Sequence, residues 1–192
     1  GYSLRFPRNA WVETNAYAST MGIDGNNPRT ISFWMFVEDH GHEIGWPRPN
    51  NNGWQPGVYG IGRRYSSNGS QNALWAIRGF WDTSSFRRFY SSHWGHDPEV
   101  FVSEGVRDKW THVAHIYTGS QILVYANGNL VLTSQKDDLF TQNNFALQFG
   151  RWTDEDSYMD DNGIHRRTFK GLLDDFRVYD TALPESDVSL IY

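Results

Sequence analysis

The sequence predicts an all-β fold, a two-sheet antiparallel β-sandwich with one short C-terminal helix. Two observations predict it. Short runs of β-branched and aromatic residues recur between clusters of Gly, Asn, Pro and Ser, which is typical of sandwiches and barrels. The dipeptide Asn127-Gly128 separates two alternating runs, and both residues readily adopt the positive φ angles of a tight hairpin turn.

Eleven such runs are expected to form strands, each bounded by turn residues. In chain order they are Ser3–Phe6, Trp11–Thr14, Ile31–Val37, Gly57–Arg63, Ala73–Gly79, Arg87–Ser91, Thr111–Tyr117, Gln121–Ala126, Asn129–Thr133, Ala146–Phe149 and Lys170–Tyr179.

In the last run the acids Asp174 and Asp175 separate two apolar residues, Leu173 and Phe176. This break in alternation predicts a β-bulge that turns at least one carboxylate toward a loop.

The C-terminal helix is predicted from its first turn. Pro184 suits that turn because N–H groups in the first turn make no hydrogen bond within the helix, so the missing N–H of proline costs nothing. The acids Glu185 and Asp187 are favourable near the positive end of the helix dipole. Val188, Leu190 and Ile191 are then expected to pack onto the sandwich.

Length and composition narrow the class of protein. The 192 residues include no long low-complexity stretch, and we expect residues 1–192 to form one domain. Because the chain begins at Gly1 without Met, we expect a module of a larger secreted or cell-surface protein, with neighbouring domains. No cysteine is present, so disulfides and thiolate metal sites are excluded. The net charge of −5 argues against nucleic-acid binding, and no run of residues is apolar enough to insert into a membrane.

Several motifs fall in a recognisable order. One strand carries Trp110, His112, Val113 and Ala114, the next hairpin turns at Asn127-Gly128, and the last strand reads Gly171, Leu173, Asp174, Asp175, Arg177 and Tyr179 before Ala182-Leu183 and the helix. The chain thereby resembles the laminin-G-like jelly-roll domains of the concanavalin A-like lectin and glucanase superfamily. The resemblance covers nearly the whole chain, with SLRFPRNAWVET and TISFWMFV as its first edge and first core strands. It implies the sandwich fold, core positions for Trp34 and Trp110, and, as in some relatives, a structural calcium near the terminal strand.

Long segments with few strand signals are the expected location of a ligand site, because long loops in compact domains are usually functional. They span residues 39–55, 81–108 and 151–167. A mixed rim of rings and guanidinium groups can stack on a sugar and bind its hydroxyls, or can bind a peptide carboxylate. The candidates are Trp46, Trp54, Trp81, Trp94, Trp152, Arg63, Arg64, Arg87, Arg88 and Arg151. The alternative for each Trp is a structural ring that holds a long loop in place.

Calcium is the predicted cofactor. Five carboxylates and one amide fall within nine positions of the third loop, and this crowding is repulsive unless a cation compensates. The candidate ligands are Asp154, Asp156, Asp160, Asp161 and Asn162, with Asp174, Asp175 and Asp24 as further candidates at the bulge and in the turn Asp24-Gly25-Asn26-Asn27. The alternatives are a solvated loop balanced by arginines, a salt-bridging pair with Arg5 or Arg177, and a simple turn.

Enzyme motifs are missing from the sequence. The Glu-x-Asp-x-x-Glu string of the superfamily's glucanases is absent, as are a nucleophile elbow and a P-loop. The pairs His40/His42 and His93/His96 lack a zinc-site pattern, and His112 and His115 should face opposite sides of their strand. The sequence therefore predicts a noncatalytic, calcium-assisted, carbohydrate-binding module. The alternatives are a peptide-binding adhesin domain, a glycan-cleaving enzyme with unpatterned carboxylates, and a structural spacer.

Overall fold

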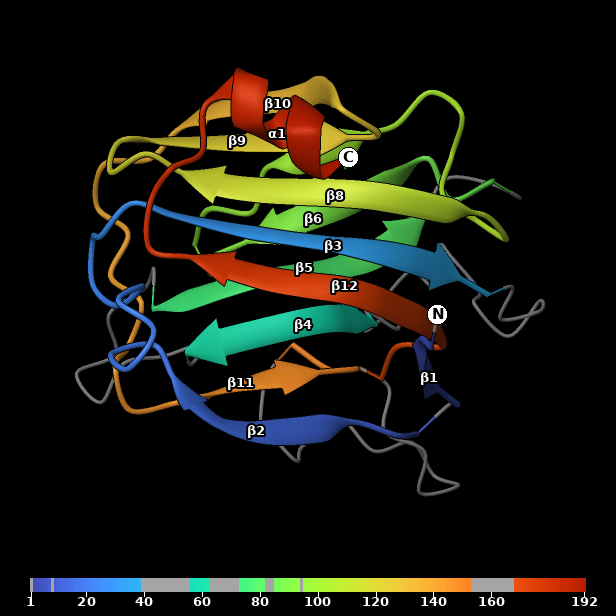
Figure 1. Ribbon diagram of the computed structural model, residues 1–192, viewed down its shortest axis with the longest axis horizontal. Helices are drawn as coiled ribbons and strands as arrows, with labels where there is room; N and C mark the ends of the chain where they lie inside the picture. Colours follow the sequence, from blue (N-terminus) through green and yellow to red (C-terminus); the bar gives the residue numbers. More distant parts are fainter. Residues whose placement is uncertain are drawn as a thin grey trace.

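The computed structural model describes residues 2–7, 9–38, 56–62, 73–81, 85–93, 95–152 and 168–192. These form two six-stranded antiparallel sheets and a C-terminal helix (Figure 1), so the predicted sandwich is confirmed. The first sheet has the order β1 (Leu4–Phe6), β12 (Gly171–Tyr179), β3 (Arg29–Val37), β8 (Trp110–Tyr117), β9 (Gln121–Ala126) and β10 (Asn129–Gln135). The second sheet has the order β2 (Val12–Tyr17), β11 (Ala146–Phe149), β4 (Gly57–Gly62), β5 (Leu74–Trp81), β6 (Arg88–Ser92) and β7 (Glu99–Phe101).

The main core lies between the two sheets. Because side chains alternate along a strand, each strand contributes every second residue to the interior. Phe33 of β3, for example, packs edge-on against Tyr59 of β4, with 5.6 Å between ring centroids. Phe176 of β12 stacks on Phe33 and contacts Phe149 of β11, which joins the two layers.

The hairpin and the bulge form where the sequence predicts them. Asn127 and Gly128 have φ angles of 49° and 76° and connect β9 to β10. The β12–β3 register shifts between Asp174 and Arg177, and Asp175 has a φ of 47°. Both carboxylates are exposed at the bulge.

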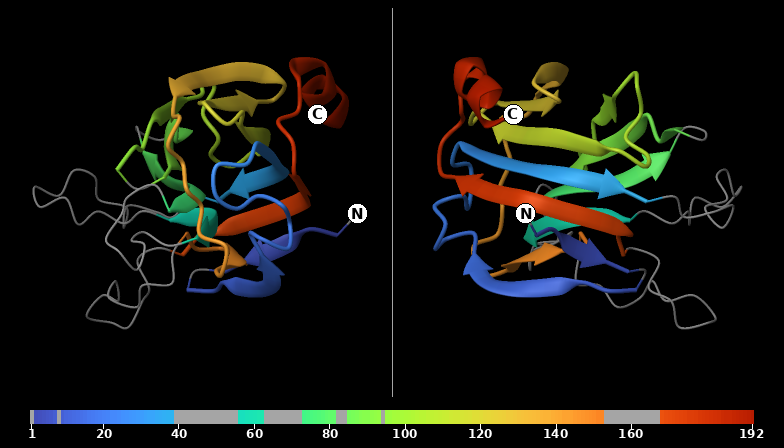
Figure 2. Two further views of the ribbon diagram at one scale, coloured as in Figure 1. Left: turned by 90° about the vertical axis from the view of Figure 1, so that its left-hand side faces the viewer. Right: turned by 45° about the vertical axis from the view of Figure 1, so that its right-hand side comes forward.

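Helix α1 (Glu185–Ile191) lies against the outer face of the first sheet, as the two views in Figure 2 show. Val188 is fully buried against Ala114, Ile116 and Tyr125 of β8 and β9. The expectation for Leu190 is wrong, because this side chain is 84% exposed on the far side of the helix. Among the described residues, no helix combines the length and apolar character needed to cross a lipid bilayer.

Two tryptophans assigned to the core by resemblance lie elsewhere. Trp34 and Trp110 occupy the outer face of the first sheet, where Trp110 is 40% exposed and packs edge-on against Phe36. Trp34 is half-buried because Tyr192, beyond the end of α1, stacks on it at 5.7 Å. The indole that fills the centre of the core is that of Trp75 on β5.

Strand β7 was not predicted. It is only three residues long and follows Pro98, so it gives little alternation to detect. It pairs with β6 at one edge of the second sheet.

Candidate ligand-binding face

The outer face of the second sheet carries polar and aromatic side chains, and within the described residues no helix lies over it. The strand register places Glu13, Gln148, Gly60, Ala76 and Ser92 in one row across five strands. A second row runs from Arg78 through Tyr90 to Glu99, and a third includes Arg88 and Phe101. Paired residues in adjacent strands point to the same face, so these side chains share one surface.

The middle of this face is occupied by Trp152, which follows β11 and crosses β4. A Cβ atom on Gly57 would lie 2.3 Å from the Trp152 amide nitrogen, and one on Gly60 would lie 2.3 Å from its carbonyl oxygen. Glycine at both positions therefore lets the chain approach β4 closely. Trp152 packs on Leu74 and Ala76 of β5 and is only 1% exposed.

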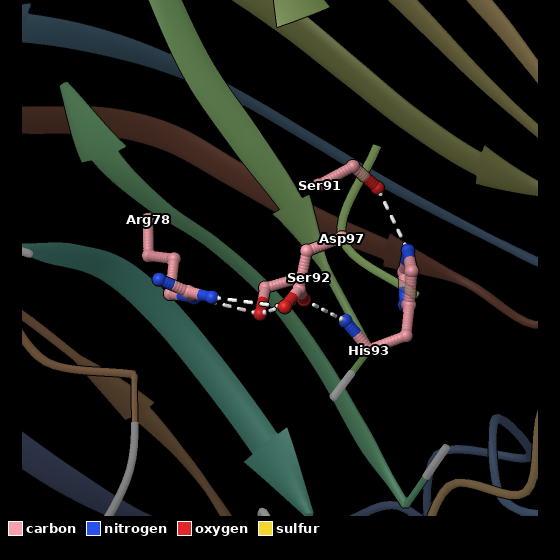
Figure 3. A network of polar contacts seen from close by, with 5 residues as sticks. All are labelled: Arg78, Ser91, Ser92, His93 and Asp97. Atoms are coloured by element: carbon pink, nitrogen blue, oxygen red, sulfur yellow. Dashed lines mark hydrogen bonds and ion pairs between the residues drawn. The ribbon is translucent and has the colours of Figure 1, made fainter. Parts of the chain in front are cut away.

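Beside Trp152, the guanidinium of Arg78 lies between two rings, 4.5 Å from the Trp152 centroid and 5.1 Å from that of Tyr90. Its Nε donates to Ser92 Oγ at 2.7 Å, and its Nη2 pairs with Asp97 Oδ2 at 3.0 Å (Figure 3). Ser92 Oγ in turn donates to Asp97 Oδ1 at 2.7 Å. Arg78 is 4% exposed, so its contacts position the surrounding side chains and tie the turn at Asp97 to the sheet.

Arg151 makes a similar guanidinium and ring contact on one side of the centre, 4.7 Å over the ring of Trp11. Its Nε donates to Gln148 Oε1 at 2.8 Å, and its Nη2 lies 3.4 Å from Glu13 Oε2. Gln148 Nε2 also donates to Glu13 Oε2 at 3.0 Å. Trp11 remains 39% exposed.

Arg88 makes the third such contact at the opposite edge. Its guanidinium lies 5.2 Å over the ring of Phe101 and pairs with the Glu99 carboxylate. Phe101 is 42% exposed, and the Arg88 and Glu99 side chains are both partly exposed. The Phe101 flank therefore presents a ring, a cation and an anion to solvent, whereas the Trp11 flank presents a ring and the Glu13 carboxylate above the buried Arg151. Such groups suit stacking on a ligand ring and hydrogen bonding to its hydroxyl groups.

A buried hydrogen-bonded chain lies directly beneath this face, between the sheets. The Tyr59 hydroxyl is 2.6 Å from His115 Nδ1, and Ser91 Oγ is 2.7 Å from His115 Nε2 and 2.8 Å from His93 Nε2. Trp75 stacks on His115, with centroids 3.7 Å apart. His112 and His115 therefore face opposite sides of β8 as predicted, and both are buried.

Ser91 links the two imidazoles through one hydroxyl group. Because this hydroxyl has a single proton, it donates to one histidine Nε2 and accepts from the other. Burial lowers the pKa of His115 well below its ordinary value, with Arg29 adding to the effect. Burial also lowers the pKa of His93, and His115, His96 and Lys136 contribute. Both imidazoles are therefore neutral at pH 7.

Ser91, Ser92 and His93 join the buried chain to the outer face. Ser91 and His93 point inward, Ser92 points outward to Arg78, and the His93 amide donates to Asp97 Oδ1 at 3.1 Å. Figure 3 shows the Ser91–His93 contact of the buried chain beside the contacts of Arg78, Ser92 and Asp97 at the end of β6.

The family follows from a comparison of the sequence with known families. A laminin-G-type family model, described as "Concanavalin A-like lectin/glucanases superfamily", matches residues 8–189. The chain belongs to this superfamily. The resemblance stated from the Trp110 and Asp174 motifs is thereby confirmed. A search of curated proteins found no match to this sequence.

Solved structures share its fold. A carbohydrate-binding module (CBM40) of a Ruminococcus gnavus IT-sialidase, bound to α2,3-sialyllactose, is 12% identical with a TM-score of 0.66 and covers 100% of this chain and 96% of its own. A native heptameric SAP-like pentraxin from Limulus polyphemus is 14% identical, with a TM-score of 0.64. The match covers 98% of this chain and 77% of the pentraxin chain. Domain 4 of the Geobacillus stearothermophilus extracellular arabinanase AbnA, in complex with arabinotriose, is 17% identical, with a TM-score of 0.54. The match covers 98% of this chain and 71% of the arabinanase chain. At these identities the likeness shows the shared fold.

The predicted ligand residues fall into three groups. Trp46, Trp54, Trp94, Arg63 and Arg64 lie outside the described residues, and Trp81 is described only as the last residue of β5. Trp152 and Arg151 lie on the outer face of the second sheet but are buried there, so Trp152 does not present its ring to solvent. Arg88 is partly exposed on the same face, and Arg87 precedes it and is half-buried.

The further calcium candidates in the described residues lie beside protein groups that bind them or their neighbours. Asp175 pairs with Arg177 through two hydrogen bonds of 2.8 and 2.6 Å, and Asp174 Oδ1 accepts from the Asp175 amide. At the Asp24 turn the cation is Arg29, whose guanidinium binds the carbonyls of Ile23, Gly25 and Asn27.

Across the described ranges, no three His, Asp or Glu side chains gather as metal ligands. The remaining candidates, Asp154, Asp156, Asp160, Asp161 and Asn162, lie outside the described residues.

Sequence reasoning missed Trp11, Glu13, Tyr90, Glu99 and Phe101. Their signal is period-2 alternation: Trp11 and Glu13 are two apart, as are Arg88 and Tyr90, and Glu99 and Phe101. The prediction places the site in long loops, whereas these rings lie in or next to strands.

Proposed function

We propose that this protein is a noncatalytic glycan-binding module whose ligand contacts the outer face of the second sheet. One observation carries the proposal: three guanidinium groups on this face, those of Arg78, Arg88 and Arg151, each lie over an aromatic ring and each pair with a carboxylate. The exposed rings of Trp11 and Phe101 supply stacking area. The partly exposed Arg88 supplies hydrogen-bond donors, and the Glu13 and Glu99 carboxylates supply acceptors for sugar hydroxyls. The buried Arg78 and Arg151 hold the neighbouring rings and carboxylates in position. The similar structures described with sialyllactose and arabinotriose support the same ligand class.

The charge pairing favours a neutral glycan segment over an acidic one. A carboxylate ligand is normally bound by an arginine whose fork is available for two parallel hydrogen bonds. On this face Glu99 pairs with Arg88, Glu13 with Arg151 and Asp97 with Arg78. The same pairing favours the glycan over the peptide carboxylate that we considered as an alternative ligand.

Replacing Trp11 by Ala is expected to weaken glycan binding about tenfold, which corresponds to the loss of one ring-stacking contact. Trp110→Ala is the matched control, since Trp110 is equally exposed but lies on the other sheet. Binding is measured on a glycan array and then in solution, by competition with the free sugar. The proposal is wrong if no glycan gives a competable signal, or if both variants lose the same affinity. Capture of a peptide that depends on its free C-terminus would support the adhesin alternative.

We also propose a calcium ion held by the acidic segment Asp154, Asp156, Asp160, Asp161 and Asn162, whose oxygen-rich composition supports it. It would order that segment or bind ligand oxygens directly. Removing it with EGTA is expected to lower the melting temperature by several degrees, because an ion bound only to the folded state stabilises it.

The measurement is a thermal melt of protein shown beforehand to contain the metal. Asp160→Asn should remove most of the EGTA effect, whereas Asp174→Asn should leave it intact. An identical melt with and without EGTA would eliminate calcium.

We further propose that the module works at the cell surface or outside the cell, as part of a larger chain, and releases its glycan unaltered. The arabinanase domain among the similar structures is described as part of an extracellular enzyme, which supports this location. Incubation with a bound oligosaccharide should yield no new reducing ends. A turnover that disappears in Asp156→Asn or Asp160→Asn would make the protein an enzyme.

A further inference from the structure

A pocket of about 380 Å³ lies beyond the ends of β6 and β7 and is lined by Ser85, Glu104, Arg107, Asp108 and Lys109. Ser85 precedes β6, whereas the other four residues belong to the connection from β7 to β8. The pocket therefore lies where the chain passes from the second sheet to the first.

The backbone around the pocket is fixed by hydrogen bonds to both sheets. The amides of Val106 and Arg107 donate to the Ser85 carbonyl at 3.0 and 3.2 Å, and the Asp108 amide donates to the Val37 carbonyl at 2.8 Å. Gly105 has a φ of 71°, and a Cβ there would lie 2.2 Å from the Ser85 oxygen. Glycine thus allows the two walls to meet, and the site is preformed, which lowers the ordering cost of binding.

The side chains that line the pocket balance in charge. Arg107 Nε donates to Asp108 Oδ2 at 3.2 Å, and Lys109 Nζ donates to the Glu104 carbonyl oxygen at 2.7 Å. The lining thus combines two cationic residues, two acidic residues and a serine. An anion would meet Glu104 and Asp108, and a metal ion would meet Arg107 and Lys109, so neither matches this lining. An uncharged ligand that both donates and accepts hydrogen bonds matches this lining.

We propose that this pocket is a second binding site for a neutral, hydroxyl-rich ligand of monosaccharide size. Its volume lies at the small end of the range for ligand pockets, roughly 300–1,000 Å³. The Glu104 and Asp108 carboxylates accept from ligand hydroxyls, whereas Arg107, Lys109 and Ser85 donate to them. The site does not depend on the outer-face residues and would exist whether or not a glycan binds there.

The test is a titration of ¹⁵N-labelled protein with the methyl glycosides of glucose, galactose, mannose, arabinose and N-acetylglucosamine. At least one should shift the amide signals of Gly105 and Lys109 saturably. Glu104→Gln should weaken that binding about tenfold, since a charged acceptor is lost, and Ser85→Ala should weaken it as well. Glu185→Gln, an exposed glutamate on α1, is the matched control and should leave the binding unchanged.

The Trp11→Ala variant distinguishes binding in this pocket from binding on the outer face. In this variant the Gly105 and Lys109 amide signals should still shift, even if glycan capture is lost. Three results would overturn the proposal. They are no saturable shift with any of the five glycosides, equal binding by Glu104→Gln and the control, or shifts produced by inorganic phosphate in place of the sugars.

Discussion

Lowering the pH from 7 to 5 is expected to reduce the free energy of unfolding by about 4 kcal/mol through His93 and His115 together. Both imidazoles are buried, and burial holds their pKa values well below the ordinary 6.5. The unfolded chain takes up a proton at each histidine as the pH falls through 6.5, while the folded chain does not. Stability is therefore complete above this pH and is lost below it, at about 2 kcal/mol for each histidine over this interval.

Urea unfolding at a series of pH values measures the effect. The window from 7 to 5 lies above the range in which most carboxylates titrate, so the histidines dominate it. His112, whose pKa burial lowers to about 4, acts in the same direction. In His115→Phe the slope against pH should fall by about 1.4 kcal/mol per pH unit at its steepest point. A free energy of unfolding that is flat from pH 7 to 5 would show that the buried chain accepts protons in the folded state.

Replacing Arg78 by Ala is expected to cost about 3 kcal/mol of stability, because removing one partner of a buried ion pair leaves the other uncompensated. Asp97 would lose its cation, Ser92 an N–H donor, and Trp152 and Tyr90 the guanidinium between them. The loss belongs to the low end of the range for buried pairs, since the Asp97 side chain is 25% exposed and can regain water.

Arg88→Ala provides the matched control on the same face. Arg88 also lies over a ring and pairs with a carboxylate, but its side chain is 40% exposed. Exposed ion pairs contribute at most about 1 kcal/mol, so this variant should unfold at nearly the wild-type urea concentration. Equal losses in the two variants would show that burial does not set the strength of these contacts. The double variant Arg78→Ala with Asp97→Asn should lose less than the sum of its single changes.

The first sheet illustrates what a sequence pattern reveals and what it leaves open. Alternation shows that Trp34 and His112 point one way while Phe33 and Val113 point the other, because the period is a property of the strand itself. It does not show which side meets the second sheet. The core positions implied for Trp34 and Trp110 were wrong for this reason, and Trp75 occupies the centre of the core instead.

Trp152 shows the same limit in a loop. Beside an acidic segment, its ring was a candidate for an exposed ligand contact. Gly57 and Gly60, more than ninety positions earlier in the chain, leave the space in which it is buried. Likewise, the oxygen-rich turn at Asp24 reads as a cation site, and the cation it holds is the side chain of Arg29.

The sequence by itself determined every described strand except β7, the Asn127-Gly128 turn, the bulge at Asp174, the C-terminal helix and the family. Each of these depends on residues close together in the chain or on a motif in a set order. Only the tertiary structure decided which rings are buried, that Arg78 lies between Tyr90 and Trp152, and that His93 and His115 share Ser91. These contacts join strands that are distant in sequence, and their partners are set by register and by the packing of one sheet on the other, which no local pattern encodes.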